Sequence, residues 1–127
     1  MNVLGAGRAI LYREPGWETF HLWLILSDPL GDPPRVVAVM VRTAKDFTDD
    51  TVVLDEGDHP FVRHPSSVHY STADLFEVRA LLAAIEKGHC HLREDMSRKL
   101  LTKVRRGLIE SPFTRNRLRL LCEGLFT

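Results

Sequence analysis

The sequence predicts an α+β fold, in which a small antiparallel β-barrel is followed by C-terminal helices. Short apolar runs rich in strand-forming residues occupy the first half, and apolar residues at helical spacing occupy the second. Several short strands in so few residues commonly close into a barrel, because closure removes exposed edges. With 127 residues the chain is long enough for one modest core, so we expect residues 1–127 to form a single domain.

Four apolar runs predict strands, at residues 8–14, 21–27, 35–43 and 51–58. The third run is apolar almost throughout, so we expect it to be buried on both faces or to line a barrel. The fourth is expected to end in a turn at Glu56 and Gly57.

Three helical segments are predicted in the second half. Residues 71–88 divide into strand to about residue 77 and helix afterwards, with Gly88 suited to the C-cap. From Asp95 to Glu110 apolar residues recur every fourth position, which indicates an amphipathic helix. A last short helix is expected from an N-cap at Thr114 to a stop at Gly124.

The segment GDHPFVRHPSSVHY, residues 57–70, contains three of the six histidines. Its polarity and its two prolines argue against a core strand or a helix. The imidazoles could therefore bind a metal, carry out acid–base chemistry, or simply belong to a loop.

The sequence shows no signal peptide, so a cytoplasmic location is expected. The net charge is zero, but residues 28–58 carry eight acids against three bases, and residues 93–119 carry nine bases against three acids. Cys90 and Cys122 show no CxxC spacing and are expected to be reduced and buried. No apolar run approaches the roughly 20 residues that cross a bilayer, so no membrane contact is expected.

Several segments, taken in order, resemble the PemK/MazF family of bacterial toxins. They are HLWLILS at 21–27, VVAVMVRT at 36–43, HPSSV at 64–68, EKGHCHL at 86–92 and DMSRKLLTKVRRGL at 95–108. The resemblance covers about residues 18–110 and implies an SH3-like barrel and a divergent endoribonuclease toxin of a type II toxin–antitoxin pair. The family's catalytic arginine falls on His21, whereas its strand-end threonine is retained as Thr43. GDHPFVRH, residues 57–64, has no counterpart in typical members.

The resemblance implies metal-independent cleavage of single-stranded RNA, by attack of the 2′-hydroxyl on the adjacent phosphate. That reaction needs a base, an acid and a positive group for the phosphorane oxygens. Because imidazole exchanges protons near neutral pH, we predict His21 and His59 as the acid–base pair, with His64 as the alternative to His59. Thr43 is expected to orient the phosphate and Arg63 to clamp it.

Further RNA contacts are predicted at Arg42, Trp23, Ser66, Ser67 and Tyr70. Arg42 is a second candidate for the phosphate, and aromatic rings can stack on bases. The basic positions between Arg98 and Arg119 could contact RNA or an acidic antitoxin segment, or could form an ordinary solvated helix face. The resemblance also implies a homodimer and no cofactor.

Other interpretations remain open. The replacement of arginine by His21 favours a non-catalytic barrel that binds nucleic acid or a protein partner, unless the histidine-rich segment folds over Thr43. A histidine-bound metal would require residues 57–70 to bend inward, because their five-residue spacing lacks the close pairs typical of zinc sites, and we predict no metal. Cys90, between His89 and His91 in a short strand, could be a reactive thiol but is expected to be buried. Each predicted site residue could equally be an ordinary strand-end or loop residue.

Overall fold

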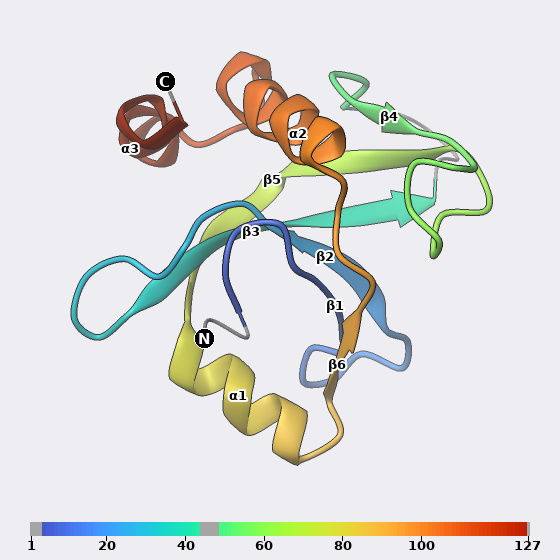
Figure 1. Ribbon diagram of the computed structural model, residues 1–127, viewed down its shortest axis with the longest axis vertical. Coiled ribbons are helices and arrows are strands. Elements are labelled where there is room, and N and C mark those ends of the chain that lie inside the picture. The colour runs from blue at the N-terminus through green and yellow to red at the C-terminus, as the bar shows by residue number, and fades with distance from the viewer. Residues whose placement is uncertain (1–3, 44–48, 127) are drawn as a thin grey trace.

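The computed structural model describes residues 4–43 and 49–126. The elements, shown in Figure 1, are β1 (Ala9–Tyr12), β2 (His21–Ile25), β3 (Arg35–Thr43), β4 (Val53–Leu54), β5 (Ser66–Glu77), α1 (Val78–Glu86), β6 (Cys90–Arg93), α2 (Arg98–Glu110) and α3 (Asn116–Phe126). The strands form one curled antiparallel sheet in the order β4-β5-β3-β2-β1-β6. The predicted α+β class is confirmed, and over the described residues the edge strands β4 and β6 do not pair with each other.

The sheet buries both of its faces. Val37, Val39 and Val41 of β3 belong to one core cluster, which also contains side chains of α2 and α3. The alternate residues Val36 and Ala38 belong to a second cluster, which contains Leu81 of α1. Figure 1 shows the corresponding arrangement, with α1 on one side of the sheet and α2 and α3 on the other. The prediction that residues 35–43 form a strand buried on both faces is therefore confirmed.

The prediction that residues 57–70 contain no core strand is wrong for residues 66–70, which begin β5. The first residues of β5 pair with β3 on one side, and Ser66 and Ser67 also pair with β4 on the other, so the backbone at the start of this strand finds partners despite its polar sequence. The polar side chains also find partners. The Ser67 hydroxyl donates to the Asp49 carbonyl at 2.9 Å, and the Tyr70 hydroxyl donates to the Val104 carbonyl at 2.8 Å.

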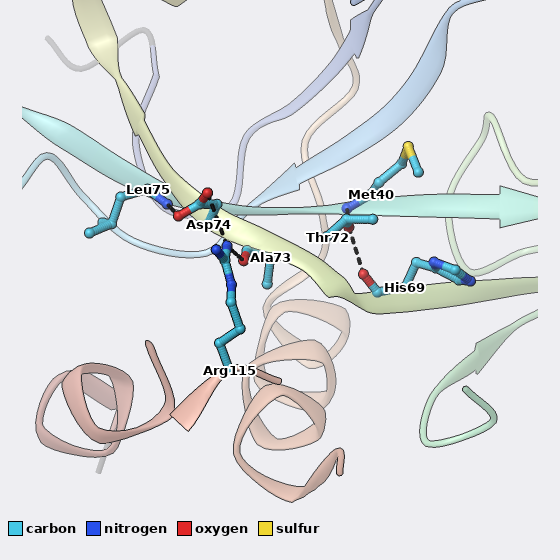
Figure 2. A network of polar contacts seen from close by, with 7 residues as sticks. All are labelled: Met40, His69, Thr72, Ala73, Asp74, Leu75 and Arg115. Carbon is cyan, nitrogen blue, oxygen red and sulfur yellow. Dashed lines mark hydrogen bonds and ion pairs between the residues drawn. The ribbon is translucent and has the colours of Figure 1, made fainter. Parts of the chain in front are cut away.

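A bulge interrupts the pairing of β5 with β3. Ala38 pairs with Asp74 and Met40 with His69, so β5 passes five positions where β3 passes two. The Thr72 hydroxyl bridges the gap: it donates to the His69 carbonyl at 2.6 Å and accepts the Met40 N–H at 3.1 Å (Figure 2). This side chain replaces ladder contacts that the bulge removes.

The helix boundaries agree with prediction at α1 and differ elsewhere. Strand gives way to helix after residue 77, as predicted. α2 begins at Arg98, because the Ser97 hydroxyl caps it by accepting the Leu100 N–H at 3.0 Å. Thr114 is not the N-cap of α3: its hydroxyl is buried with no hydrogen-bond partner among the described residues, and the helix begins at Asn116.

α3 also continues past Gly124, because residues on both sides of this glycine pack against the core. Buried Leu118 and Cys122 lie before it, and Phe126 lies after it. Its start is joined to β5 by Arg115, which donates to the Ala73 carbonyl and forms an ion pair with Asp74, both at 2.8–2.9 Å (Figure 2).

The strand predicted at residues 51–58 is much shorter than expected, since β4 contains only Val53 and Leu54. A turn follows at once, in which the Asp55 N–H donates to the Asp58 carboxylate at 2.8 Å. Gly57 adopts a φ of 99° there, so the predicted turn at Glu56 and Gly57 is confirmed. The loop from this turn to Ser66 leads to the candidate site.

Candidate functional site

A cavity of about 430 Å³ lies at the end of the sheet, beneath the loop between β4 and β5. It is lined by Leu22, Val41, Thr43, Pro60, Phe61, Val62, Arg63, His64, Ser66 and Arg93. Four of the predicted site residues therefore meet in one cavity: Thr43, Arg63, His64 and Ser66. We call this cavity the β4–β5 pocket.

Strand pairing brings two hydroxyl groups together in the β4–β5 pocket. Thr43, the last residue of β3, is the cross-strand partner of Ser66, the first residue of β5. Alternation along β3 places Thr43 on the same face as Val41, which pairs with Leu22 and forms the apolar floor. The Ser66 hydroxyl donates to the His64 carbonyl at 2.8 Å, which fixes the end of the loop at the pocket.

His59 anchors the loop from below. Its side chain is 2 % exposed, and both ring nitrogens are occupied. Nδ1 accepts the Phe61 N–H at 3.1 Å, so Nε2 carries the proton and donates to the Glu94 carbonyl at 2.6 Å. The ring therefore joins the loop to the end of β6 and has no free nitrogen to offer a substrate. We assign His59 a positioning role, in place of the acid–base role predicted from the sequence.

Two guanidinium groups line the β4–β5 pocket. Arg93 lies 2.9 Å from the Glu94 carboxylate, and its guanidinium carbon lies 5.3 Å from the centroid of the Phe61 ring. The pKa of Glu94 is lowered, mainly by a hydrogen bond from its own backbone N–H; burial opposes this shift, and the charge and hydrogen bond of Arg93 support it. Arg63 is exposed and forms no ion pair with any residue that the structure describes. The pocket can therefore attract an anion.

His21 and Arg42 lie on the opposite face of the sheet from Thr43. His21 pairs with Tyr12 and lies two positions before Trp23, so it shares the face of Trp23, which belongs to the core cluster that contains Leu81 of α1. Arg42 pairs with Ser67 and is adjacent to Thr43 in β3. It therefore lies on the opposite face from Thr43 and on the same face as His21. The predicted combination of His21 and Thr43 at one phosphate is therefore not assembled within this sheet.

The environment of His21 favours its neutral form. Its pKa is lowered, mainly by burial and further by the positive charge of Arg42, while Glu14 has the opposite effect. The ring of Trp17 packs edge-on against the imidazole at a centroid distance of 5.0 Å.

Three residues predicted to contact RNA are instead part of the interior. Trp23 is 4 % exposed and Tyr70 is 1 % exposed, so neither ring has a face available for a base. Burial raises the pKa of Tyr70, with additional effects from Asp49 and Glu110. The Ser67 hydroxyl is buried and donates to a backbone carbonyl, as described above. Ser66 remains at the pocket.

The cysteines are buried and free, as expected. Burial raises the pKa of both thiols to about 11, so they are protonated at neutral pH and are poor nucleophiles. In residues 4–43 and 49–126 no group of three or more His, Cys, Asp and Glu side chains could hold a metal ion. None of the helices among these residues is long and apolar enough to span a membrane.

Phe61 and Arg93 are pocket residues that sequence reasoning did not select. Phe61 lies within the histidine-rich segment, but an apolar side chain among charged and titratable groups carries no local signal of a binding site. Arg93 reaches the pocket through the pairing of β6 with β1, and this pairing carries no local sequence signal.

Comparison with known proteins returns no match to a family model, a curated protein or a solved structure.

Proposed function

We propose that the chain is an endoribonuclease that cleaves single-stranded RNA at the β4–β5 pocket without a metal ion. The observation that carries this proposal is the meeting of an imidazole, two guanidinium groups and two hydroxyls in one cavity: His64, Arg63, Arg93, Thr43 and Ser66. The proposal includes the assignment of the curled sheet to the SH3-like barrels of the PemK/MazF family.

In the proposed reaction, His64 removes the proton of a ribose 2′-hydroxyl. The 2′-oxygen attacks the adjacent phosphorus, the bond from phosphorus to the 5′-oxygen breaks, and the leaving oxygen takes a proton from water. The products are a 2′,3′-cyclic phosphate and a 5′-hydroxyl end. His64 is exposed and its pocket is open to solvent, so its proton exchanges with water between turnovers.

The remaining pocket groups match the other requirements of this reaction. Arg63 and Arg93 supply positive charge for the phosphorane oxygens, and guanidinium remains protonated throughout. Thr43 and Ser66 offer hydroxyl hydrogen bonds to the phosphate. The Phe61 ring is 39 % exposed beside them and can stack on a neighbouring base.

A cleavage assay tests the proposal. The purified chain is incubated with a single-stranded RNA and with the same RNA carrying 2′-deoxyribose throughout. We expect the ribose strand to be cleaved and the deoxyribose strand to stay intact. Cleavage should persist in the presence of a chelator and should leave cyclic phosphate ends. His64→Ala should lower the rate by a factor of about 100 or more, as expected for loss of a general base. His69→Ala is the matched control, since His69 does not line the pocket.

Full activity of His64→Ala, or equal cleavage of the deoxyribose strand, would contradict the proposed chemistry. A wild-type chain that binds RNA and leaves it intact would favour a second candidate, a non-catalytic barrel that binds nucleic acid or a protein partner. One observation favours this second candidate: among the described residues, His64 is the single imidazole that lines the pocket, whereas an acid–base pair was expected.

We further propose that the protein acts in the cytoplasm as the toxin of a type II toxin–antitoxin pair, forms homodimers and is inhibited by an acidic antitoxin. Expression in a bacterial host is then expected to arrest growth, and His64→Ala is expected to relieve the arrest. Co-expression of a neighbouring reading frame with an acidic tail should also restore growth. Normal growth with the active wild-type protein present would contradict the toxin role while leaving RNA cleavage intact.

A further inference from the structure

A second cavity, of about 610 Å³, lies between the loop that follows β1 and helix α1. We call it the β1–α1 pocket. The alanines on the facing side of the helix, Ala80, Ala83 and Ala84, leave room for a ligand. Trp17 lines the opposite side and is 40 % exposed, although its edge-on contact with His21 holds the ring in place. The pocket therefore offers space beside a fixed aromatic ring.

Positive groups line the same cavity. Arg13 donates from Nη2 to Nδ1 of His89 at 3.1 Å, so the guanidinium is held at the cavity wall. Lys87 follows the C-terminal end of α1 and is exposed. Glu14 is the one carboxylate among the described residues that line the pocket, so Arg13 and Lys87 leave a net positive charge. An aromatic ring next to cations is the combination that binds a base together with its phosphate.

A line of rings and cations connects the β1–α1 pocket to the β4–β5 pocket. The Arg13 guanidinium lies 5.5 Å from the centroid of the Phe20 ring, and Phe20 lies 5.2 Å from the ring of His91. His91 and Arg93 are two positions apart on β6, so alternation places them on the same side of the strand. Arg93 lines the β4–β5 pocket. The loop after β1 and the loop after β4 also lie on the same side of the molecule in Figure 1.

We propose that the β1–α1 pocket is a second nucleotide subsite for the same RNA strand. Trp17 stacks on one base, Arg13 and Lys87 bind its phosphate, and the strand passes over Phe20 and His91 to the β4–β5 pocket. This inference rests on RNA being the substrate. It adds that binding is divided between two cavities, so that affinity depends on the length of the RNA.

Fluorescence anisotropy tests this subsite with RNA whose 2′-oxygens are methylated, which prevents cleavage. A trinucleotide is compared with a strand of about 10 nucleotides, within the range of about 4–16 that one small barrel domain binds. We expect Trp17→Ala to weaken binding of the longer strand about 10-fold and to leave the trinucleotide unaffected. Lys87→Ala should have a smaller effect of the same kind. Arg79→Ala is the control: it removes an exposed cation of α1 that lines neither pocket.

The proposal fails if Trp17→Ala and Lys87→Ala leave the affinities for the trinucleotide and for the longer strand unchanged, or if they weaken both affinities equally. It also fails if the longer strand binds no more tightly than the trinucleotide. Lys87 is exposed, so its variant should keep the fold, and thermal unfolding of each variant separates a lost contact from a lost structure. Because the RNA stays intact, failure of cleavage in the His64 assay leaves this measurement unaffected, and the two proposals can fail separately.

Discussion

The imidazole of His21 is disfavoured as a cation in the folded chain. Burial and Arg42 lower its pKa below the ordinary value of about 6.5. The unfolded chain therefore binds more protons than the folded chain between the two pKa values. As a consequence, the contribution of His21 to stability falls as the pH drops through this window from about 7 towards the lowered pKa.

We predict that Arg42→Gln raises the pKa of His21 and that Glu14→Gln lowers it, because these substitutions remove a repulsive and an attractive charge respectively. NMR titration of the imidazole protons measures both shifts. Chemical denaturation between pH 5 and pH 8, an interval centred on the ordinary histidine pKa, should show a weaker loss of stability in acid for His21→Gln than for the wild type. A wild-type pKa at or above the ordinary value would contradict the environment described.

Gly107 is the residue of α2 that allows the helix to approach the sheet. A Cβ atom at this position would clash with the Tyr70 hydroxyl and with Val52, and would lie 2.8 Å from Cζ of Tyr70. These neighbours belong to the core and cannot move freely.

Gly107→Ala is expected to lower the free energy of unfolding by about 2 kcal/mol or more, through overpacking. Gly124→Ala in α3 is the matched control, because a Cβ there meets no atom within 4 Å. The control should stabilise the protein by about 0.5–1 kcal/mol, since alanine favours helix over glycine. Urea denaturation measures both changes. Equal effects of the two substitutions would show that helix propensity, and not contact with Tyr70, dominates.

At the scale of the elements, the conformation of the loop from Asp55 to Pro65 depends on the two hydrogen bonds of the His59 ring. Removal of the ring leaves the Phe61 N–H and the Glu94 carbonyl without partners and opens a cavity beneath the loop. His64 lies in the same loop but is exposed.

We therefore predict opposite behaviour for the two histidines. His59→Ala should lower the free energy of unfolding by about 2–4 kcal/mol and should reduce cleavage through misplacement of the loop. His64→Ala should change stability by less than about 0.5 kcal/mol while lowering the cleavage rate by a factor of about 100 or more. If His59→Ala is as stable as the wild type, His59 is free to act as the acid or base first predicted from the sequence.

The elements that the sequence predicts best are those whose pattern is local. Residues 35–43 match β3 at both ends, and the four-residue spacing that includes Leu100 and Val104 identifies α2. Residues 66–70 belong to the segment 57–70, whose polarity and two prolines argue against a core strand. Their strand is stabilised by pairing with β3 and β4, which are distant in sequence, so the local pattern could not reveal it.

At the scale of the whole molecule, the sequence could identify several chemical groups of the candidate site, but it could not show which of them lie on the same face of the sheet. Thr43 and His21 lie at the ends of two predicted strands, and their faces depend on register. Once the register is known, alternation separates them. The histidine-rich segment likewise contributes one buried anchor, His59, and one pocket residue, His64, and the spacing of the two residues does not reveal which of them is buried.

The bulge in β5 affects how the strand can tolerate an insertion. Before it, Val68 and Tyr70 face the cluster that contains α2 and α3, and after it Ala73 and Leu75 do so. Even-numbered residues of β5 thus face this cluster before the bulge and odd-numbered residues face it afterwards. The Thr72 hydroxyl bridges the bulge by its hydrogen bond to the His69 carbonyl (Figure 2). A one-residue insertion at this position can be absorbed without turning every later side chain over. A change in the length of β5 at the bulge therefore leaves the pairing of Thr43 with Ser66 at the β4–β5 pocket in place.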